Sequence, residues 1–126
     1  MSLDAIGIVS EDVDASIAFY GLLGLSFKAL GNGHYEALMP SGIRIMLDTV
    51  ALIKSINPSW EKLSGSSVIL CFKQNSAAEV NVCYRRMVAA GALSLKAPWD
   101  AFWGQRYACV YDPDGHQVDV FSDLSS

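Results

Sequence analysis

The sequence lacks the features that mark membrane proteins, nucleic-acid-binding proteins and secreted proteins. Across 126 residues, no apolar run approaches the ~20 residues that a transmembrane helix requires. The N-terminus does not show the basic, apolar and small-residue order of a signal peptide. No cluster of Lys and Arg is present and the formal net charge is −4, which argues against binding to nucleic acid. We therefore expect a cytoplasmic protein with no membrane or nucleic-acid partner.

Cysteine is scarce and is not arranged for disulfides or for metal binding. The chain has an odd number of cysteines, Cys71, Cys83 and Cys109, and no two of them form a Cys-x-x-Cys pair. We therefore expect buried, reduced thiols. Apolar residues make up 52% of the chain and charged residues 17%, which is typical of a folded domain. This apolar excess also favours a buried subunit interface, and we expect a homodimer.

Two stretches of the chain repeat one pattern of strands and turns. The tail contains two apolar strands joined by Asp-Pro-Asp-Gly, in which Pro presets φ and Gly accepts a turn conformation. The same pattern begins earlier in the chain at Pro40, the counterpart of Pro113, and Tyr20 likewise has its counterpart in Tyr84. The chain is therefore predicted to be a single domain of two βαβββ modules. The modules are expected at about 3–48 and 67–122, joined by a connecting loop at 49–66.

Capping residues and apolar spacing predict one helix in each module. Asp12 is the expected N-cap of the first helix, which Gly24 ends. Ser76 and Glu79 form a capping box for the second helix, which Gly91 ends. Strands are expected at about 3–9, 25–30, 34–39, 43–48, 67–73, 93–96, 104–111 and 116–122.

These elements resemble a known family. The likeness rests on their order, on the stretch from Asp12 to Tyr20 with the following Leu23-Gly24-Leu25, and on the Trp-Gly-Gln-Arg to Asp-Pro-Asp-Gly tail. Together they resemble the glyoxalase, bleomycin-resistance and extradiol-dioxygenase proteins, the vicinal oxygen chelate superfamily. The resemblance implies an α+β fold in which two modules form a curved mixed β-sheet with a concave ligand groove. Since that superfamily contains lyases, dioxygenases, epimerases, thiol transferases and drug binders, function has to be argued from the site.

The resemblance also indicates which positions would bind a metal. In metal-dependent members, ligands come from the first and last strands of each module, and those positions resemble Ala5, Met46, Ile69 and Asp119 here. Only Asp119 offers a donor suited to a hard or borderline divalent ion. We therefore expect no metal and no cofactor.

The two histidines are not expected to replace the missing ligands. His116 lies three residues from Asp119, so strand alternation points it to the other face. Pairing Leu38 with Ile43 in the first hairpin also places His34 on the face opposite Met46. Both are therefore expected to be histidines beside turns.

Alternation along the last strand of each module predicts the lining of the groove. Gln117, Asp119 and Phe121 share one face, as do Arg44, Met46 and Asp48. The residues facing these strands depend on how the hairpins pair.

The pairing of the tail hairpin leaves an alternative open. Pairing Tyr111 with His116 puts Ala108 opposite Asp119 and brings Arg106 to the groove, where it would hold a ligand or form a structural ion pair. A slip of one residue would instead bring Tyr107 and Cys109 to the groove.

Aromatic residues are concentrated near the start of the seventh expected strand. Trp99, Phe102 and Trp103 lie there, with Trp60 in the connecting loop and Tyr35 in the first module, and such rings suit planar or cationic ligands. Core packing or a dimer interface would explain each ring equally well. The predicted ligand-binding residues are Tyr35, Arg44, Met46, Ile69, Trp103, Arg106, Ala108, Gln117, Asp119 and Phe121.

Two functions remain open at this stage. The first is a metal-free binding protein, similar to bleomycin-resistance members, that holds an aromatic or cationic drug-like molecule. The second is an enzyme, either a glyoxalase-like lyase or dioxygenase-like protein with an atypical metal site, or a catalyst with Asp119 as general base. The sequence identifies no second acid or base to work with Asp119.

Overall fold

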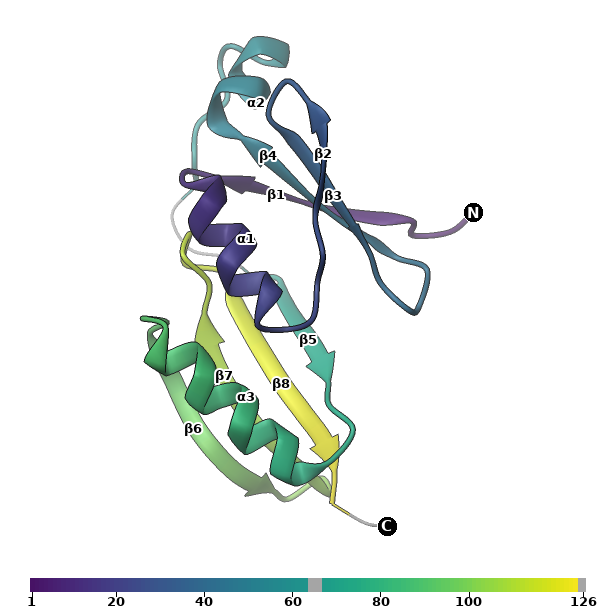
Figure 1. Cartoon of the computed structure of the whole chain (residues 1–126), viewed down its shortest axis with the longest axis vertical. Helices are drawn as coiled ribbons and strands as arrows, with labels where there is room; N and C mark the ends of the chain where they lie inside the picture. Colours follow the sequence, from purple (N-terminus) through teal and green to yellow (C-terminus); the bar gives the residue numbers. More distant parts are fainter. Residues whose placement is uncertain (64–66, 125–126) are drawn as a thin grey trace. The chain divides into compact units, whose positions relative to one another are not determined.

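The structure, a computed structural model, describes residues 1–63 and 67–124. The chain forms two compact units, residues 1–63 and 64–126, and each contains one four-stranded mixed sheet with its own helices (Figure 1). The strand orders are β1-β4-β3-β2 and β5-β8-β7-β6, so the two sheets have the same topology. The predicted α+β class and the eight predicted strands are therefore confirmed. None of the helices in the described ranges is long and apolar enough to cross a membrane.

The first unit contains one helix that the sequence pattern did not predict. Its elements are β1 (Ala5–Ser10), α1 (Val13–Gly21), β2 (Lys28–Gly31), β3 (His34–Leu38), β4 (Arg44–Thr49) and α2 (Val50–Ile56). Asp12 caps α1 as expected, and its side chain accepts a hydrogen bond from the Ala15 N–H. The expectation of an irregular segment throughout 49–66 is wrong for α2. The Thr49 hydroxyl caps this helix by accepting the Leu52 N–H at 3.1 Å.

The second unit follows the predicted order, with a longer sixth strand. Its elements are β5 (Ile69–Lys73), α3 (Ala77–Ala89), β6 (Ser94–Ala101), β7 (Gln105–Tyr111) and β8 (Gln117–Asp123). Ser76 caps α3 by accepting the Glu79 N–H, and the Glu79 carboxylate reaches back to the Asn75 N–H at 3.2 Å. The strand expected at 93–96 extends to Ala101 and so includes Trp99.

Each sheet has a helix face, turned toward the helix of its own unit, and a far face on the other side. Ser10 on β1 shares a 2.7 Å hydrogen bond with Ser16 on α1, and Arg106 on β7 bonds Asn81 on α3, so these residues mark the helix faces. The alternating apolar residues of β1, β3, β4, β7 and β8 are buried on these faces. They are Ile8, Ala37, Ile45, Leu47, Ala108, Val110, Val118 and Val120. The core of each unit therefore lies between its helix and its sheet, and the far faces carry the more polar residues.

The tail hairpin pairs one residue away from the predicted register. The Asp112 N–H donates to the His116 carbonyl at 2.8 Å, which leaves a three-residue loop that ends at Gly115 with φ of +88°. A glycine in this left-handed conformation is typical of three-residue hairpin loops. The predicted four-residue loop, which paired Tyr111 with His116, is wrong because Asp112 belongs to the ladder.

The hairpin of the first unit differs from the prediction in the same way. The Met39 N–H donates to the Ile43 carbonyl at 2.9 Å, and Gly42 ends the three-residue loop with φ of +94°. The predicted pairing of Leu38 with Ile43 is therefore also wrong by one residue. Because side chains alternate along a strand, each slip exchanges the faces assigned to the partner strand.

Candidate functional site

The far face of the second sheet is built around Asp119, in the central strand β8. In the ladder, Asp119 lies between Cys71 on β5 and Cys109 on β7. Its side chain is only 4% exposed, and it accepts a hydrogen bond from the Gln117 amide at 3.0 Å. The Cys71 Sγ lies 4.0 Å from the Asp119 Oδ2 and 3.6 Å from the Tyr107 hydroxyl. A single carboxylate is thus surrounded by thiols, a phenol and an amide.

The acidic groups next to Asp119 are held in their neutral forms. Burial, followed by the hydrogen bonds to Cys71 and Asp119, raises the pKa of Tyr107 well above its usual range. Burial and the neighbouring Asp119 carboxylate raise the pKa of Cys109 to about 12. Tyr107 and Cys109 therefore keep their protons at neutral pH and act as hydrogen-bond donors to the carboxylate rather than as nucleophiles.

Five aromatic side chains continue this far face beyond Asp119. We call them the aromatic cluster: Trp99, Phe102, Trp103, Tyr107 and Phe121. The Tyr107 and Phe121 rings are stacked with centroids 5.8 Å apart, and Trp103 meets Tyr107 edge to face at 5.4 Å. Trp103 is 49% exposed, so one side of the cluster is accessible in this chain. The Lys96 ammonium lies 4.3 Å from the centroid of Trp99, which shows that these rings already hold a cation.

The one-residue slip removes two predicted lining residues from this face. Ala108 pairs with Val120 and is buried on the helix face, so its predicted position opposite Asp119 is wrong. Arg106 also points to the helix face. Its guanidinium bonds Asn81 at 3.1 Å and Asp100 at 3.0 Å, so the predicted place near Asp119 is wrong for Arg106 as well. The alternative lining residues, Tyr107 and Cys109, are the ones beside Asp119.

The positions that resemble the family's metal ligands share the far faces, but they are not ladder partners of one another. Asp119 pairs with Cys71, while Ile69 pairs with Gln117 one step earlier along the same face. In the first unit, Met46 pairs with Gly7, and Ala5 lies opposite Arg44. Met46 covers Gly7 so closely that a Cβ there would lie 3.4 Å from the Met46 Cε.

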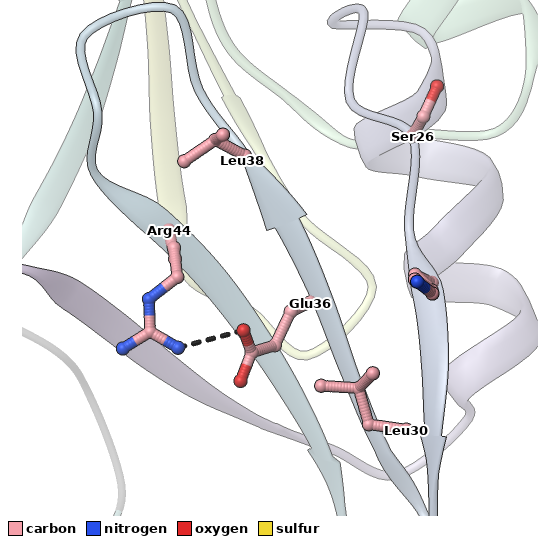
Figure 2. Close-up of a pocket in the computed structure, with 6 residues that line it drawn as sticks. Ser26, Leu30, Glu36, Leu38 and Arg44 are labelled. Carbon is pink, nitrogen blue, oxygen red and sulfur yellow. Dashed lines mark hydrogen bonds and ion pairs between the residues drawn. The ribbon is translucent and has the colours of Figure 1, made fainter.

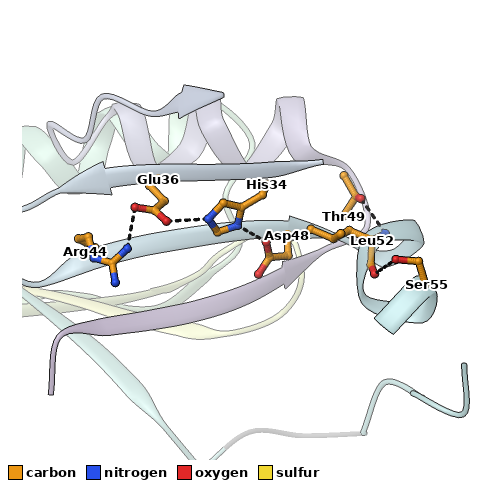
Figure 3. Close-up of polar contacts among 7 residues, drawn as sticks. All are labelled: His34, Glu36, Arg44, Asp48, Thr49, Leu52 and Ser55. Atoms are coloured by element: carbon orange, nitrogen blue, oxygen red, sulfur yellow. Dashed lines mark hydrogen bonds and ion pairs between the residues drawn. The ribbon is translucent and has the colours of Figure 1, made fainter. Parts of the chain in front are cut away.

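A chain of four ionisable side chains occupies the far face of the first sheet (Figure 3). The His34 Nδ1 bonds the Asp48 Oδ1 at 2.5 Å, and its Nε2 bonds the Glu36 Oε2 at 2.6 Å. The second Glu36 oxygen accepts from the Arg44 Nη1 at 2.8 Å. We call Asp48, His34, Glu36 and Arg44 the ionic chain. The carboxylates of Asp48 and Glu36, in that order, raise the pKa of His34, and His34 and Arg44 lower the pKa of Glu36.

The slip in the first hairpin explains why this chain was not predicted. His34 pairs with Asp48 and shares the face of Met46, so the prediction that it points away is wrong. Tyr35 pairs with Leu47 and therefore lies on the helix face, so its predicted place beside Met46 and Arg44 is also wrong. The sequence contains a signal that points to the correct register, because a three-residue hairpin loop favours glycine at its last position, where the backbone is left-handed.

The residues on the far faces do not fit a resident divalent metal. Both ring nitrogens of His34 are occupied by carboxylates, and the nearest neighbours of Asp119 are sulfur, phenol and amide groups. In the described ranges, three His, Cys, Asp or Glu ligand atoms come within 4.8 Å of one another only at Asp112, Asp114 and His116. There, the Asp112 carboxylate accepts from two backbone N–H groups and lies 2.8 Å from the His116 Nδ1, bonds that shape the turn.

Cys71 is a residue of this site that the sequence analysis did not predict to lie there. It was expected to be buried, but it is exposed, whereas Cys83 and Cys109 are buried as predicted. When the two halves of the sequence are aligned so that Tyr20 matches Tyr84, Gly7 matches Cys71. This alignment was the sequence signal that Gly7 and Cys71 occupy equivalent positions in the two sheets. The binding roles predicted for Arg44, Met46, Ile69, Trp103, Gln117, Asp119 and Phe121 stay predictions.

Comparisons with known proteins agree with this architecture. The model of the Glyoxalase/Bleomycin resistance protein/Dioxygenase superfamily matches residues 2–120. An uncharacterized protein of Mycobacterium bovis is 30% identical over 122 residues, covering 86% of this chain and 75% of that protein. An uncharacterized protein of Mycolicibacterium smegmatis is 29% identical over 115 residues, covering 91% of this chain and 88% of that protein.

Solved structures show the same fold. A glyoxalase/bleomycin resistance protein/dioxygenase family enzyme from Burkholderia phytofirmans superposes with a TM-score of 0.87 at 20% identity, covering 98% of this chain and 100% of that one. A glyoxalase/bleomycin resistance protein/dioxygenase from Nocardioides gives a TM-score of 0.77 at 25% identity, covering 100% and 85%. These likenesses concern architecture, so the activity has to be inferred from the far faces.

Proposed function

Because the chain belongs to the glyoxalase/bleomycin resistance protein/dioxygenase superfamily, we propose that it is a metal-free binding protein for an aromatic or cationic small molecule. The proposed site is the far face of the second sheet. The observation that carries the proposal is the exposed Trp103 ring against Tyr107, which in turn stacks on Phe121, on the same sheet face as the Asp119 carboxylate. Stacking on the rings would bind a planar group, and the carboxylate would favour a positive one.

The contact between Lys96 and Trp99 supports a cationic ligand. An ammonium group 4.3 Å from the ring centroid occupies the kind of position that a ligand cation would take. Tyr107 and Cys109 remain neutral, so neither adds a negative charge beside the Asp119 carboxylate. The ligand class is therefore a planar cation or a planar molecule with one cationic substituent.

A fluorescence titration tests this function directly. Trp103 should report the binding of planar cationic compounds and glycopeptide drugs by a saturable change in tryptophan emission. Asp119→Asn should weaken cation binding by about 1.5–3 kcal/mol, because a charge-assisted contact is lost. Trp103→Ala should weaken charged and uncharged planar ligands alike.

Two controls separate a local effect from a general one. Asp14 is an exposed carboxylate on α1 in the first unit, so Asp14→Asn removes the same charge from a part of the chain that contains none of these rings. It should leave affinity unchanged, and Trp60→Phe should leave the emission response intact. No saturable response across the panel, together with turnover of a thiohemiacetal or catechol by wild type but not by Asp119→Asn, would reject the binder in favour of an enzyme. Metal stoichiometrically bound after purification without chelator would also contradict the metal-free proposal.

We also propose that the protein is a cytoplasmic homodimer. Several large apolar side chains are exposed in the single chain, among them Leu3, Val68, Ile69 and Leu93. Covering them would remove apolar area from water, which is the main source of stability in a permanent interface. Light scattering should report twice the chain mass of 13.6 kDa, and a mass near 13.6 kDa at micromolar concentration would contradict the dimer.

A further inference from the structure

We propose that a pocket on the far face of the first sheet binds a small carboxylate with an apolar tail, such as a medium-chain fatty acid. This site is built entirely within residues 1–63 and does not depend on the ligand proposed for the second unit. The pocket has a volume of about 320 Å³, near the lower end of the range for small-molecule sites. It is lined by Ser26, Lys28, Leu30, Glu36, Leu38 and Arg44 (Figure 2).

When His34 carries a proton, the charges around the pocket leave one positive charge in excess. Both oxygens of Glu36 are already engaged, one by Arg44 and the other by His34, whose second nitrogen bonds Asp48. With His34 protonated, the ionic chain contains two positive and two negative groups. Lys28 then adds a positive charge, and no carboxylate within the described residues lies within ion-pair distance of it. A single anion would therefore complete the charge balance of this pocket.

Arg44 is placed to recognise a carboxylate. Only its Nη1 is bonded to Glu36, while its other guanidinium nitrogens are turned away from that carboxylate (Figure 2). The side chain is 42% exposed, so those N–H groups are accessible in this chain. A guanidinium presents N–H groups in a planar fork that matches two carboxylate oxygens. Because Glu36 fixes one nitrogen, the rest of the fork is held in place before a ligand arrives.

Two leucines give the pocket its preference for an apolar tail. Leu30 on β2 is 52% exposed and Leu38 on β3 is 73% exposed, although both are aliphatic and line the same pocket as the charges. A short alkyl chain lying against them would cover apolar surface that the chain alone leaves open. Inorganic phosphate is also an anion but has no tail, so it should bind more weakly than an alkyl carboxylate.

Titration with octanoate tests the proposal, with octanol, octylammonium and inorganic phosphate as matched probes. Backbone amide shifts in isotope-labelled protein should move saturably with octanoate in β2, β3 and β4, and the other three probes should bind at least about tenfold more weakly. Lys28→Gln should weaken octanoate about tenfold, and Lys28→Arg should restore it. Lys54→Gln, which removes a lysine from α2, should leave the affinity unchanged.

The variants also separate this site from the one on the second sheet. Asp119→Asn should leave octanoate binding unchanged, so failure of either proposal leaves the other one testable. Arg44→Gln removes the ion-pair partner of Glu36, so a loss of octanoate binding in this variant is informative only if thermal unfolding shows an intact fold. Lys28→Gln breaks no ion pair and is therefore the cleaner test. Equal binding of octanol or octylammonium, shifts without saturation, or an unchanged affinity in Lys28→Gln would overturn the proposal.

Discussion

Replacement of Gly33 by alanine should destabilise the first unit through one identifiable contact. Gly33 lies just before β3 with φ of +85°, and a Cβ built there would overlap the Thr49 Oγ1 and lie 3.1 Å from the Thr49 Cγ2. The backbone cannot easily move away, because the Thr49 N–H donates to the Gly33 carbonyl at 3.0 Å. The Thr49 side chain would therefore have to rotate and give up its hydrogen bond to the Leu52 N–H, which caps α2.

The size of this effect follows from two contributions. A non-glycine residue in the left-handed region costs roughly 1–2 kcal/mol, of which about 0.4–1 is recovered because alanine restricts the unfolded chain. Loss of a threonine cap costs a further ~1 kcal/mol. We expect the free energy of unfolding to fall by about 2 kcal/mol in Gly33→Ala, measured by urea denaturation followed by circular dichroism.

Two other glycines provide matched controls for these contributions. Gly115 has φ of +88° and no atom within 4 Å of a built Cβ, so Gly115→Ala should cost only the backbone strain, about 1 kcal/mol or less. Gly21 ends α1 without positive φ and with open space around it, so Gly21→Ala should be neutral or slightly stabilising. If Gly33→Ala were no more destabilising than Gly115→Ala, the contact with Thr49 and its link to the α2 cap would be refuted.

Further predictions concern the ionic chain, the cap of α3 and the core. His34 has a raised pKa in the folded protein, so its contribution to stability should be complete below the unfolded value of 6.5 and lost as pH rises through the higher folded value. Thermal unfolding from pH 5 to 9 should show this loss in wild type and in His116→Gln, but not in His34→Gln. Ser76→Ala should lower stability by about 1 kcal/mol through loss of the α3 cap; an unchanged urea midpoint would contradict that role. Met87→Ala should cost about 2–5 kcal/mol because this side chain is fully buried, and a smaller loss would show that the core collapses around it.

The repeat and the helix caps could be predicted from the sequence because each depends on neighbouring residues. Asp12 and Ser76 act within three residues of the groups that they bond, and the two hairpins carry turn residues at matching positions. α2 could not be predicted from apolar periodicity, because Val50–Ile56 is short and mostly apolar and so shows no distinct polar face. The sequence did contain one signal for α2, because Thr49, a residue type that commonly caps helices, lies directly before Val50.

The composition of the far faces was harder to predict because it depends on a difference of one residue. The Asp-Pro-Asp-Gly sequence is compatible with a loop of all four residues. It is equally compatible with a loop of the last three residues, in which Asp112 pairs with the opposite strand. The first choice brings Arg106 and Ala108 beside Asp119, and the second brings Tyr107 and Cys109. Alternation within β8 was independent of this choice, so Gln117, Asp119 and Phe121 share one face as predicted.

The parallel pairing of the first and last strands has a consequence for the order of assembly in each unit. The β3–β4 and β7–β8 hairpins close short turns between consecutive strands. β1 meets β4 only after the chain has passed through α1, β2 and β3, and β5 meets β8 only after α3, β6 and β7. The entropic cost of closing a loop increases with its length, so the hairpins are favoured to form before the first strand docks.

This order also affects the far faces. β1 and β5 are edge strands, each held by one neighbour, and they contribute Gly7 and Cys71. Detachment of β5 would uncover one side of Asp119 while the β7–β8 hairpin stays paired. The side of the sheet proposed to bind a ligand is therefore completed by an edge strand, and local opening of such a strand would expose the carboxylate without unfolding the whole unit.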